Sequence, residues 1–444
     1  MIAPVLLTLL FGAGIASCSD ANEPAEAEKP ATHTQLPLAT GHGGPLQPNH
    51  LINPPDNPRA ALITALDAGL LSGDLSKNEK LSLILDTAGV PQASQVLVFS
   101  KTSLQHRLIS PSNPRAIYFN DNCYIGYVPG GIIEYGDTDP DPAVGSGLFA
   151  IDLHHNEAAE LRQDNSCLSC HEGSRTNGRV GFFIRSVFPD PEGHVITSAG
   201  STNVSHDTPI AKRWGGWYVT GKSGSTHHRG NQVTIEHPDG DAYLDNALGS
   251  NLNDLSHRFN VARYLQPTSD IVALMVLEHQ VQLHNLLTQG SAVVHEQFER
   301  SRSLAGYLEE PFEPNQNETL QRVIHSNAER IVKHLLFCDE VALTDPIVGS
   351  DLFQIQFRAN RKEDSQGRSL KDFDLKTRLF KYRCSYMVYS RAFELMHPLL
   401  KNAVLEKLQG VLSGKDQDKE FGHLSEDERK QIWQILSATA VLSK

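Results

Sequence analysis

The stretch DIVALMVLEHQVQLHNLLTQG, residues 270–290, separates two parts of the sequence that differ in character. It is apolar on nearly every side, and either Ser269 or Asp270 can cap its first turn, so it predicts a buried helix. Residues 58–262, before it, contain short β-branched and aromatic runs between Pro, Gly, Asn and Asp, which predict strands and long loops. Residues 263–444 predict further helices. We therefore expect an α+β fold, with a strand-and-loop-rich N-terminal part followed by an all-helical C-terminal part.

Several shorter runs support this division. RAIYFN (115–120) and CYIGYVP (123–129) are typical of strands, whereas TLQRVIHSNAERIVKHLLF (319–337) is typical of an amphipathic helix. YSRAFELM (389–396) predicts a helix that Pro398 stops. Ser425 followed by Glu428 predicts a capping box at the start of the last helix.

Length and composition indicate a globular protein of more than one domain. A chain of 444 residues exceeds what a single ordinary core organises, so we expect two domains, at 58–262 and 263–444. The formal net charge of −13 argues against nucleic acid as a partner, because phosphate binding requires a basic surface.

The N-terminus predicts export. Residues 1–18, MIAPVLLTLLFGAGIASC, form an apolar run that is too short for a membrane span. The last four residues resemble a bacterial lipobox, in which Cys18 becomes the lipid-modified first residue of the mature protein. The run lacks Lys and Arg, so an ordinary cleaved signal or a start site placed too far downstream stays open. Ser19, by its similarity to lipoprotein sorting signals, favours the outer membrane.

A tether follows the predicted lipid attachment site. Residues 19–57 are poor in large apolar side chains and rich in Pro, Ala and Glu. Such a segment cannot bury enough surface to fold, and we expect it to link a membrane anchor to the folded part in the periplasm.

The stretch QDNSCLSCHEGSRTNG, residues 163–178, carries the main chemical signal of the chain. It places Cys167 and Cys170 three positions apart and follows them directly with His171. A structural zinc site would need a second pair of ligands, whereas the remaining cysteines stand far apart. A thioredoxin-like dithiol would require a surrounding βαβ pattern, which the sequence does not have.

The Cys-x-x-Cys-His spacing is the signature of c-type haem attachment. Two cysteines at i and i+3 lie on one side of a helical turn, so both thiols can add to the vinyl groups of one porphyrin. The adjacent histidine then presents a nitrogen to the iron. We expect one covalent haem c held by Cys167, Cys170 and His171, and export agrees with attachment outside the cytoplasm.

Five blocks of sequence carry a wider resemblance. In order along the chain they are SNPRAIYFNDNCYIGYVPGG (112–131), CLSCHEG (167–173), RWGGWYVTG (213–221), SDIVALMVLEHQVQLHN (269–285) and CSYMVYSRAFELM (384–396). Together they resemble a family of exported bacterial proteins with a single haem motif, known as cytochrome c domain proteins. The resemblance implies haem attachment at the cysteine motif and adds no substrate.

The sixth iron ligand would decide how the haem is used, since a second strong ligand gives an electron-transfer site and an open position gives a reactive one. We favour His228, with His206, Met275 and His279 as the other candidates. Met275 and His279 share one face of the predicted buried helix. The others flank RWGGWYVTG, where Arg213, Trp214 and Trp217 could contribute a cation for a propionate and aromatic walls.

Three functions agree with these features. A membrane-anchored electron carrier with an unidentified redox partner protein is favoured, because no second catalytic motif and no second haem motif is present. A haem enzyme of peroxidase type, or a gas or redox sensor, would use an open or displaceable sixth position. An interaction protein with a structural haem is the third. Cys338 and Cys384 could form a disulfide or stay buried thiols.

Overall fold

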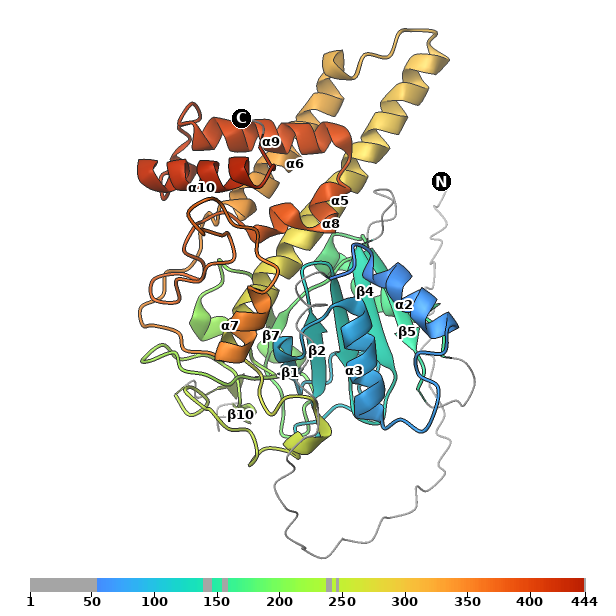
Figure 1. Cartoon of the computed structure of the whole chain (residues 1–444), viewed down its shortest axis with the longest axis vertical. Coiled ribbons are helices and arrows are strands. Elements are labelled where there is room, and N and C mark those ends of the chain that lie inside the picture. Colours follow the sequence, from blue (N-terminus) through green and yellow to red (C-terminus); the bar gives the residue numbers. More distant parts are fainter. Residues whose placement is uncertain (1–53, 139–145, 154–158, 237–241, 245–246, 443–444) are drawn as a thin grey trace, which may run out of the picture. The chain divides into compact units, whose positions relative to one another are not determined.

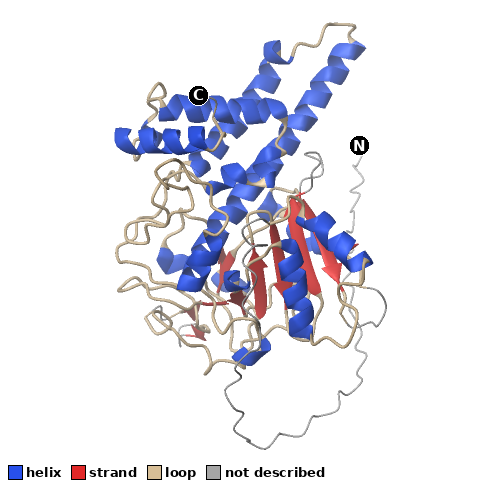
Figure 2. Cartoon of the chain, in the orientation of Figure 1, coloured by secondary structure: helices blue, strands red, loops and turns tan. Residues whose placement is uncertain are grey.

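The computed structural model describes residues 54–442 apart from 139–145, 154–158, 237–241 and 245–246 (Figure 1). The predicted lipid attachment site at Cys18 and most of the predicted tether lie outside the described residues. Within the described part, no helix is both long enough and apolar enough to cross a membrane. The α+β class is confirmed, because an antiparallel sheet and a set of helices both contribute to the fold (Figure 2).

The main sheet is an antiparallel array of seven strands. Their order is β6 (Arg162–Gln163), β5 (Ser146–Ile151), β4 (Ile133–Thr138), β3 (Cys123–Tyr127), β2 (Arg115–Phe119), β1 (Val96–Val98) and β9 (Trp217–Tyr218). Strands β2 to β5 are neighbours in sequence and in space, as short loops allow. Two small pairs complete the described strands: β7 (Arg185–Val187) with β8 (Ser201–Asn203), and β10 (Ile235–Glu236) with β11 (Ala242–Tyr243).

The two faces of the sheet pack against different helices. Helices α2 (Pro58–Asp67) and α3 (Lys77–Ala88) cover one face, where their leucines join a core that includes Tyr118 and Ile125 (Figure 1). The opposite face carries Ile117 and Tyr124, which belong to the core around α5. Side chains alternate between the faces with the period of two that a strand imposes.

Helix α5 (Ile271–Tyr307) is the longest element of the protein. Its 37 residues give it a length of about 55 Å, so it continues well beyond the run that the sequence predicts. The Asp270 carboxylate accepts hydrogen bonds from the Val272 and Ala273 amides, which confirms Asp270 as the cap. Ser269 instead donates to the Tyr218 carbonyl.

The other helices follow α5 in the sequence. They are α6 (Glu318–Leu335), α7 (Asp351–Phe357), α8 (Arg391–Glu394), α9 (Pro398–Leu412) and α10 (Glu426–Ala438). A long irregular segment separates α7 from α8, and Pro398 begins α9 as well as ending the preceding run. One apolar cluster extends from Ala93 to Leu442, so side chains from both predicted domains share a core.

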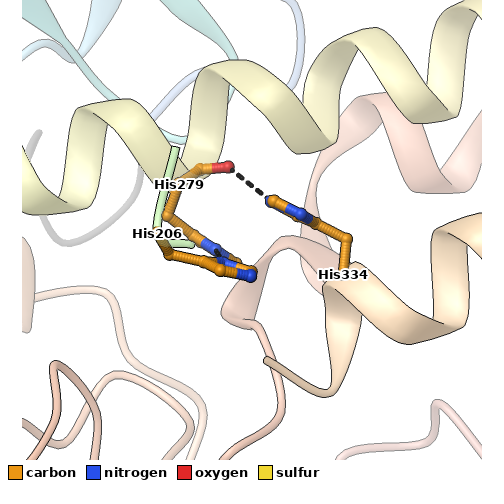
Figure 3. A group of neighbouring side chains, drawn as sticks. All are labelled: His206, His279 and His334. Carbon is orange, nitrogen blue, oxygen red and sulfur yellow. Dashed lines mark hydrogen bonds between the residues drawn. The ribbon is translucent and has the colours of Figure 1, made fainter. Parts of the chain in front are cut away.

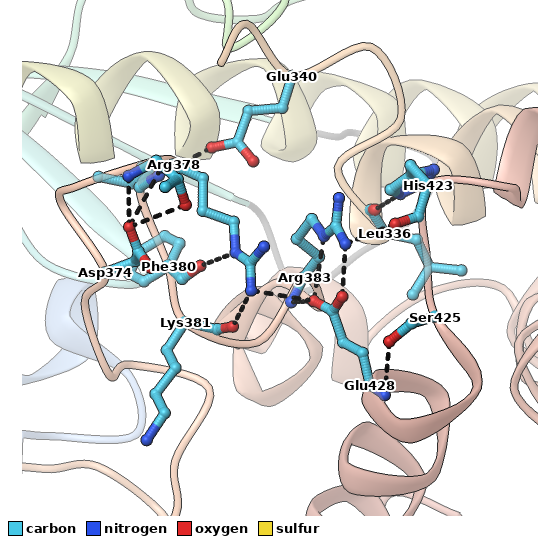
Figure 4. Close-up of polar contacts among 12 residues, drawn as sticks. Leu336, Glu340, Asp374, Arg378, Phe380, Lys381, Arg383, His423, Ser425 and Glu428 are labelled. Carbon is cyan, nitrogen blue, oxygen red and sulfur yellow. Dashed lines mark hydrogen bonds and ion pairs between the residues drawn. The ribbon is translucent and has the colours of Figure 1, made fainter. Parts of the chain in front are cut away.

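The start of α10 differs in one respect from the predicted capping box. The Ser425 hydroxyl accepts from the Glu428 amide at 3.2 Å, as predicted. The Glu428 carboxylate does not return to the cap, because Arg383 binds it through Nε at 3.0 Å (Figure 4). Arg378 lies 3.6 Å from the same carboxylate. The Arg383 guanidinium and the Arg383 amide thus together occupy the carboxylate that a capping box would use.

Candidate functional site

The cysteine motif folds as a short helical turn. A 3₁₀ turn over Asn165–Cys167 leads directly into α4 (Leu168–His171), and Asp164 begins it by accepting from the Ser166 amide at 2.9 Å. Cys167 is half-buried, whereas Cys170 is exposed to solvent. The turn therefore has the local geometry that the i, i+3 spacing predicts.

All three motif residues line one cavity between the main sheet and α5. The cavity contains about 1070 Å³ of empty space, part of it open to solvent. Most of its wall is apolar or aromatic, and the residues concerned are Val98, Leu104, Ile117, Leu148, Phe149, Phe182, Phe183, Ile184, Trp217, Leu277 and Val281. A cavity whose walls are mostly apolar, with a small number of polar groups, is the usual form of a cofactor site.

His171 is oriented by the backbone. Its Nδ1 donates to the Gly181 carbonyl at 2.7 Å, so the neutral ring keeps its lone pair on Nε2. The rings of Phe182 and Phe183 pack beside it, with centroids 6.1 Å and 5.4 Å away. Burial lowers the pKa of His171, which favours this neutral form. A histidine anchored through one nitrogen is prepared to bind a metal through the other.

Two arginines give the cavity wall unsatisfied donors. Arg115 and Arg185 both line the cavity, and the Nε of each is buried without a hydrogen-bond partner. Arg115 pairs with Glu134 through its terminal nitrogen, and Arg185 reaches the Ser201 hydroxyl at 3.3 Å. Buried donors are normally satisfied, so these two point to a ligand that carries acceptor oxygens.

Cys167 is a weakly reactive thiol. Burial, with Asp164 and Glu134 nearby, raises the pKa of Cys167 to about 11, so its reactive thiolate is scarce at neutral pH. All five described cysteines are free thiols, including Cys338 and Cys384, the pair that could have formed a disulfide.

The structure does not bring the predicted sixth ligands to this cavity. His206, Met275, His228 and His279 are all buried, and none of them lines the cavity wall. Leu277 and Val281 present one face of α5 to the cavity, whereas His279, two residues from each, lies about 160° away on the opposite face.

His228 occupies a separate buried position. Its Nδ1 accepts from the Gly230 amide at 3.0 Å, and its ring packs edge-on against Trp214 at 5.0 Å. Burial lowers its pKa to about 3.

Trp217 lies at the cavity, whereas Arg213 and Trp214 lie in the core. Trp217 lines the cavity, as its predicted role as an aromatic wall requires. Arg213 is paired with the buried Glu278 on α5, and the Trp214 indole donates to the same carboxylate at 3.2 Å. These two side chains therefore act in the core rather than at the cavity.

Most of the polar side chains that line the cavity are not indicated by the sequence motif. Arg115, Glu134 and Tyr124 come from strands, and Arg185 begins β7. The signal for Arg115 was present, because it alternates with buried residues in RAIYFN and so shares a face with Ile117. Tyr124 also bonds to His284 Nδ1 at 2.6 Å, a pairing 160 residues apart that no local pattern indicates.

Replacement of His228 by glutamine tests its buried neutral state. The folded pKa of about 3 lies below the ordinary value of about 6.5, so the unfolded chain takes up the proton first. Stability is therefore complete above pH 6.5 and decreases as the pH falls, by about 2 kcal/mol at pH 5. Between pH 7.5 and 5, we expect the free energy of unfolding of the wild type to decrease by about 2 kcal/mol more than that of His228→Gln.

Urea denaturation at the two pH values measures the difference. The exposed neighbour His227 is the matched control, and His227→Gln should retain the wild-type pH dependence. Identical pH slopes for His228→Gln and the wild type would contradict the expectation.

Comparison with known proteins adds no relative: no family model, no curated protein and no solved structure matches the chain.

Proposed function

We propose that the protein carries one covalent c-type haem in the cavity beside the cysteine motif. Cys167 and Cys170 would form the thioether bonds, and His171 would bind the iron through Nε2. The observation that carries the proposal is the state of His171, which is fixed through Nδ1 and borders an apolar cavity with both cysteines. Bound haem would supply an iron centre able to exchange electrons and to bind small ligands.

The remaining groups of the cavity fit the other parts of such a cofactor. Arg115 and Arg185 would bind the propionates, which provide the acceptor oxygens that their buried Nε atoms lack. Phe182, Phe183 and Trp217 would exclude water from the porphyrin faces. The export signal and Cys18 extend the proposal to a lipid-anchored protein of the periplasm, similar to the cytochrome c domain proteins.

We favour a haem that binds small ligands, in an enzyme of peroxidase type or a gas or redox sensor. Among the described residues that line the cavity, His171 is the single histidine, and methionine is absent. The iron would therefore lack a histidine or methionine as its second ligand, which suits the binding of a peroxide or a diatomic gas.

Electron transfer is the second candidate. Cys170 is exposed and the cavity opens to solvent, so an attached haem would have an edge that a redox partner protein could approach. This geometry supports a carrier whether or not a side chain binds the sixth position.

Visible spectroscopy distinguishes the two candidates. For an open position we expect high-spin ferric haem and rapid carbon monoxide binding to the reduced protein. His206→Gln, His228→Gln, Met275→Leu and His279→Gln should each leave the spectrum unchanged, because none of these side chains lines the cavity. A low-spin wild type that resists carbon monoxide, and that becomes high-spin in one of these variants, would overturn the ligand-binding proposal in favour of the carrier.

A further inference from the structure

His206, His279 and His334 form a compact cluster apart from the cavity of the cysteine motif (Figure 3). His206 precedes the 3₁₀ turn at Ile210–Lys212, His279 lies on α5, and His334 lies in the last turn of α6. One ring nitrogen of each lies within 4.8 Å of one from each of the others. His206 and His279 are buried, whereas His334 is partly exposed.

Each of the three rings is anchored through Nε2 by an oxygen. His206 Nε2 donates to the Cys338 carbonyl at 3.1 Å, and His334 Nε2 donates to the His279 carbonyl at 3.2 Å. His279 Nε2 lies 2.8 Å from the Ser385 hydroxyl. Metal-binding histidines are characteristically held in this way, with the second nitrogen bonded to an oxygen outside the metal's own shell.

The hydrogen bonds also define where the lone pairs lie. A carbonyl only accepts, so His206 and His334 carry their protons on Nε2 and leave Nδ1 as a lone pair. His279 Nδ1 then donates to His206 Nδ1, which is 2.9 Å away, and its Nε2 accepts from Ser385. If the His279 proton moves to Nε2, where the Ser385 oxygen can accept it, all three Nδ1 atoms become available to a cation.

The surroundings keep the cluster neutral. The rings stack on one another and on Phe337, whose centroid is 4.2 Å from that of His279. Burial lowers the pKa of each of the three histidines, which favours the neutral imidazole that binds metals. The Arg213 guanidinium, which donates to the His206 carbonyl at 3.0 Å, is paired with the Glu278 carboxylate.

A polar cavity gives the cluster access to solvent. His334 lines this cavity together with Asp207, Arg175 and Arg330, and the cavity contains about 830 Å³ of empty space, part of it open to solvent. A hydrated ion can therefore reach the partly exposed member of the cluster without passing through the apolar core.

We propose that His206, His279 and His334 bind a divalent transition metal of the zinc type. Three imidazoles without thiolate or carboxylate suit Zn²⁺ and its neighbours rather than Ca²⁺ or Mg²⁺. Nitrogen–metal distances of about 2.0–2.1 Å require the nitrogens to be about 3.4 Å apart, so the stacked rings rotate toward one another on binding. The fourth position faces the polar cavity, where water completes a tetrahedral shell.

Zinc binding to the full-length protein, expressed with a c-type maturation system, tests the site. We expect equilibrium dialysis followed by elemental analysis to give one tightly held Zn²⁺ per chain and the melting temperature to rise with Zn²⁺. His334→Gln should weaken binding by about 100-fold or more, because it removes a ligand while its amide can still donate to the His279 carbonyl. The exposed His325 on the same helix is the control, and His325→Gln should bind zinc as the wild type does.

A second variant separates this site from the cysteine motif. In Cys167→Ala with Cys170→Ala, zinc stoichiometry should stay at one per chain whether or not haem attaches to the wild type. Zinc lost in the cysteine variant but retained in His334→Gln would assign the metal to the thiols and overturn the proposal. Wild-type affinity equal to that of His334→Gln would overturn it as well.

Discussion

Replacing Cys167 and Cys170 together by alanine should abolish covalent haem attachment. Each thioether forms when a thiol adds to a vinyl group, and no other described cysteine lies in the wall of the cavity. Expressed with a c-type maturation system, the wild type should retain haem stain after denaturing electrophoresis, and the double variant should show none. This is the largest effect that we expect, since it is all or none.

Two controls make the experiment specific. Ser169→Ala changes the same helical turn without removing a thiol and should stain as the wild type does. Cys338→Ala removes a buried thiol elsewhere and should also stain. The cofactor proposal fails if the double variant still retains haem or if the wild type never acquires it. The zinc-binding test of the histidine cluster does not depend on this result.

The second large effect concerns the ion pair between Arg213 and Glu278. Both side chains are buried, with exposures of 3% and 0%. Burial raises the pKa of Glu278 to about 7, against the opposing effect of Arg213. Arg213→Met would leave the buried Glu278 carboxyl group without its cation, either as an unpaired charge or as an acid that must take up a proton to stay buried, and should cost about 3–5 kcal/mol of the free energy of unfolding. Urea denaturation at pH 7.5 provides the measurement.

Two further variants distinguish the effect of losing the ion pair from the effect of losing the packing of the arginine side chain. Arg213→Met with Glu278→Leu removes both charges and should recover much of the stability, because an apolar pair needs no compensation. Arg179→Met interrupts the exposed pair with Glu296 and should cost less than about 1 kcal/mol. Equal losses for Arg213→Met and Arg179→Met would show that burial does not control the energy of the pair.

Local sequence patterns predicted the helices and turns better than they predicted which side chains pack against them. The α5 cap at Asp270 and the helical turn around Cys167 follow from side chains within three or four residues of each other, so a sequence shows them directly. The sequence predicted the lengths of the helices less well. α5 continues past Gly290 to Tyr307, and Leu400 and Ile331 lie close to that glycine; such contacts exist only in the folded chain.

The site shows the same division. The sequence indicated Cys167, Cys170 and His171 through their spacing, and the structure places all three in the wall of one cavity. The alignment of His206 with His334 could not be foreseen, because it depends on how α6 crosses α5.

The burial of α5 also restricts how the chain can change over time. Eleven successive residues, Ile271–Val281, are all buried, so this part of the helix has no solvent-exposed side on which substitutions would be neutral. A larger or smaller side chain there strains a tightly packed neighbour or leaves a cavity beside it. A matching change at that neighbour can restore the packing. Substitutions in this segment are therefore limited to side chains of similar volume or to compensating pairs, and the segment should diverge more slowly than exposed loops.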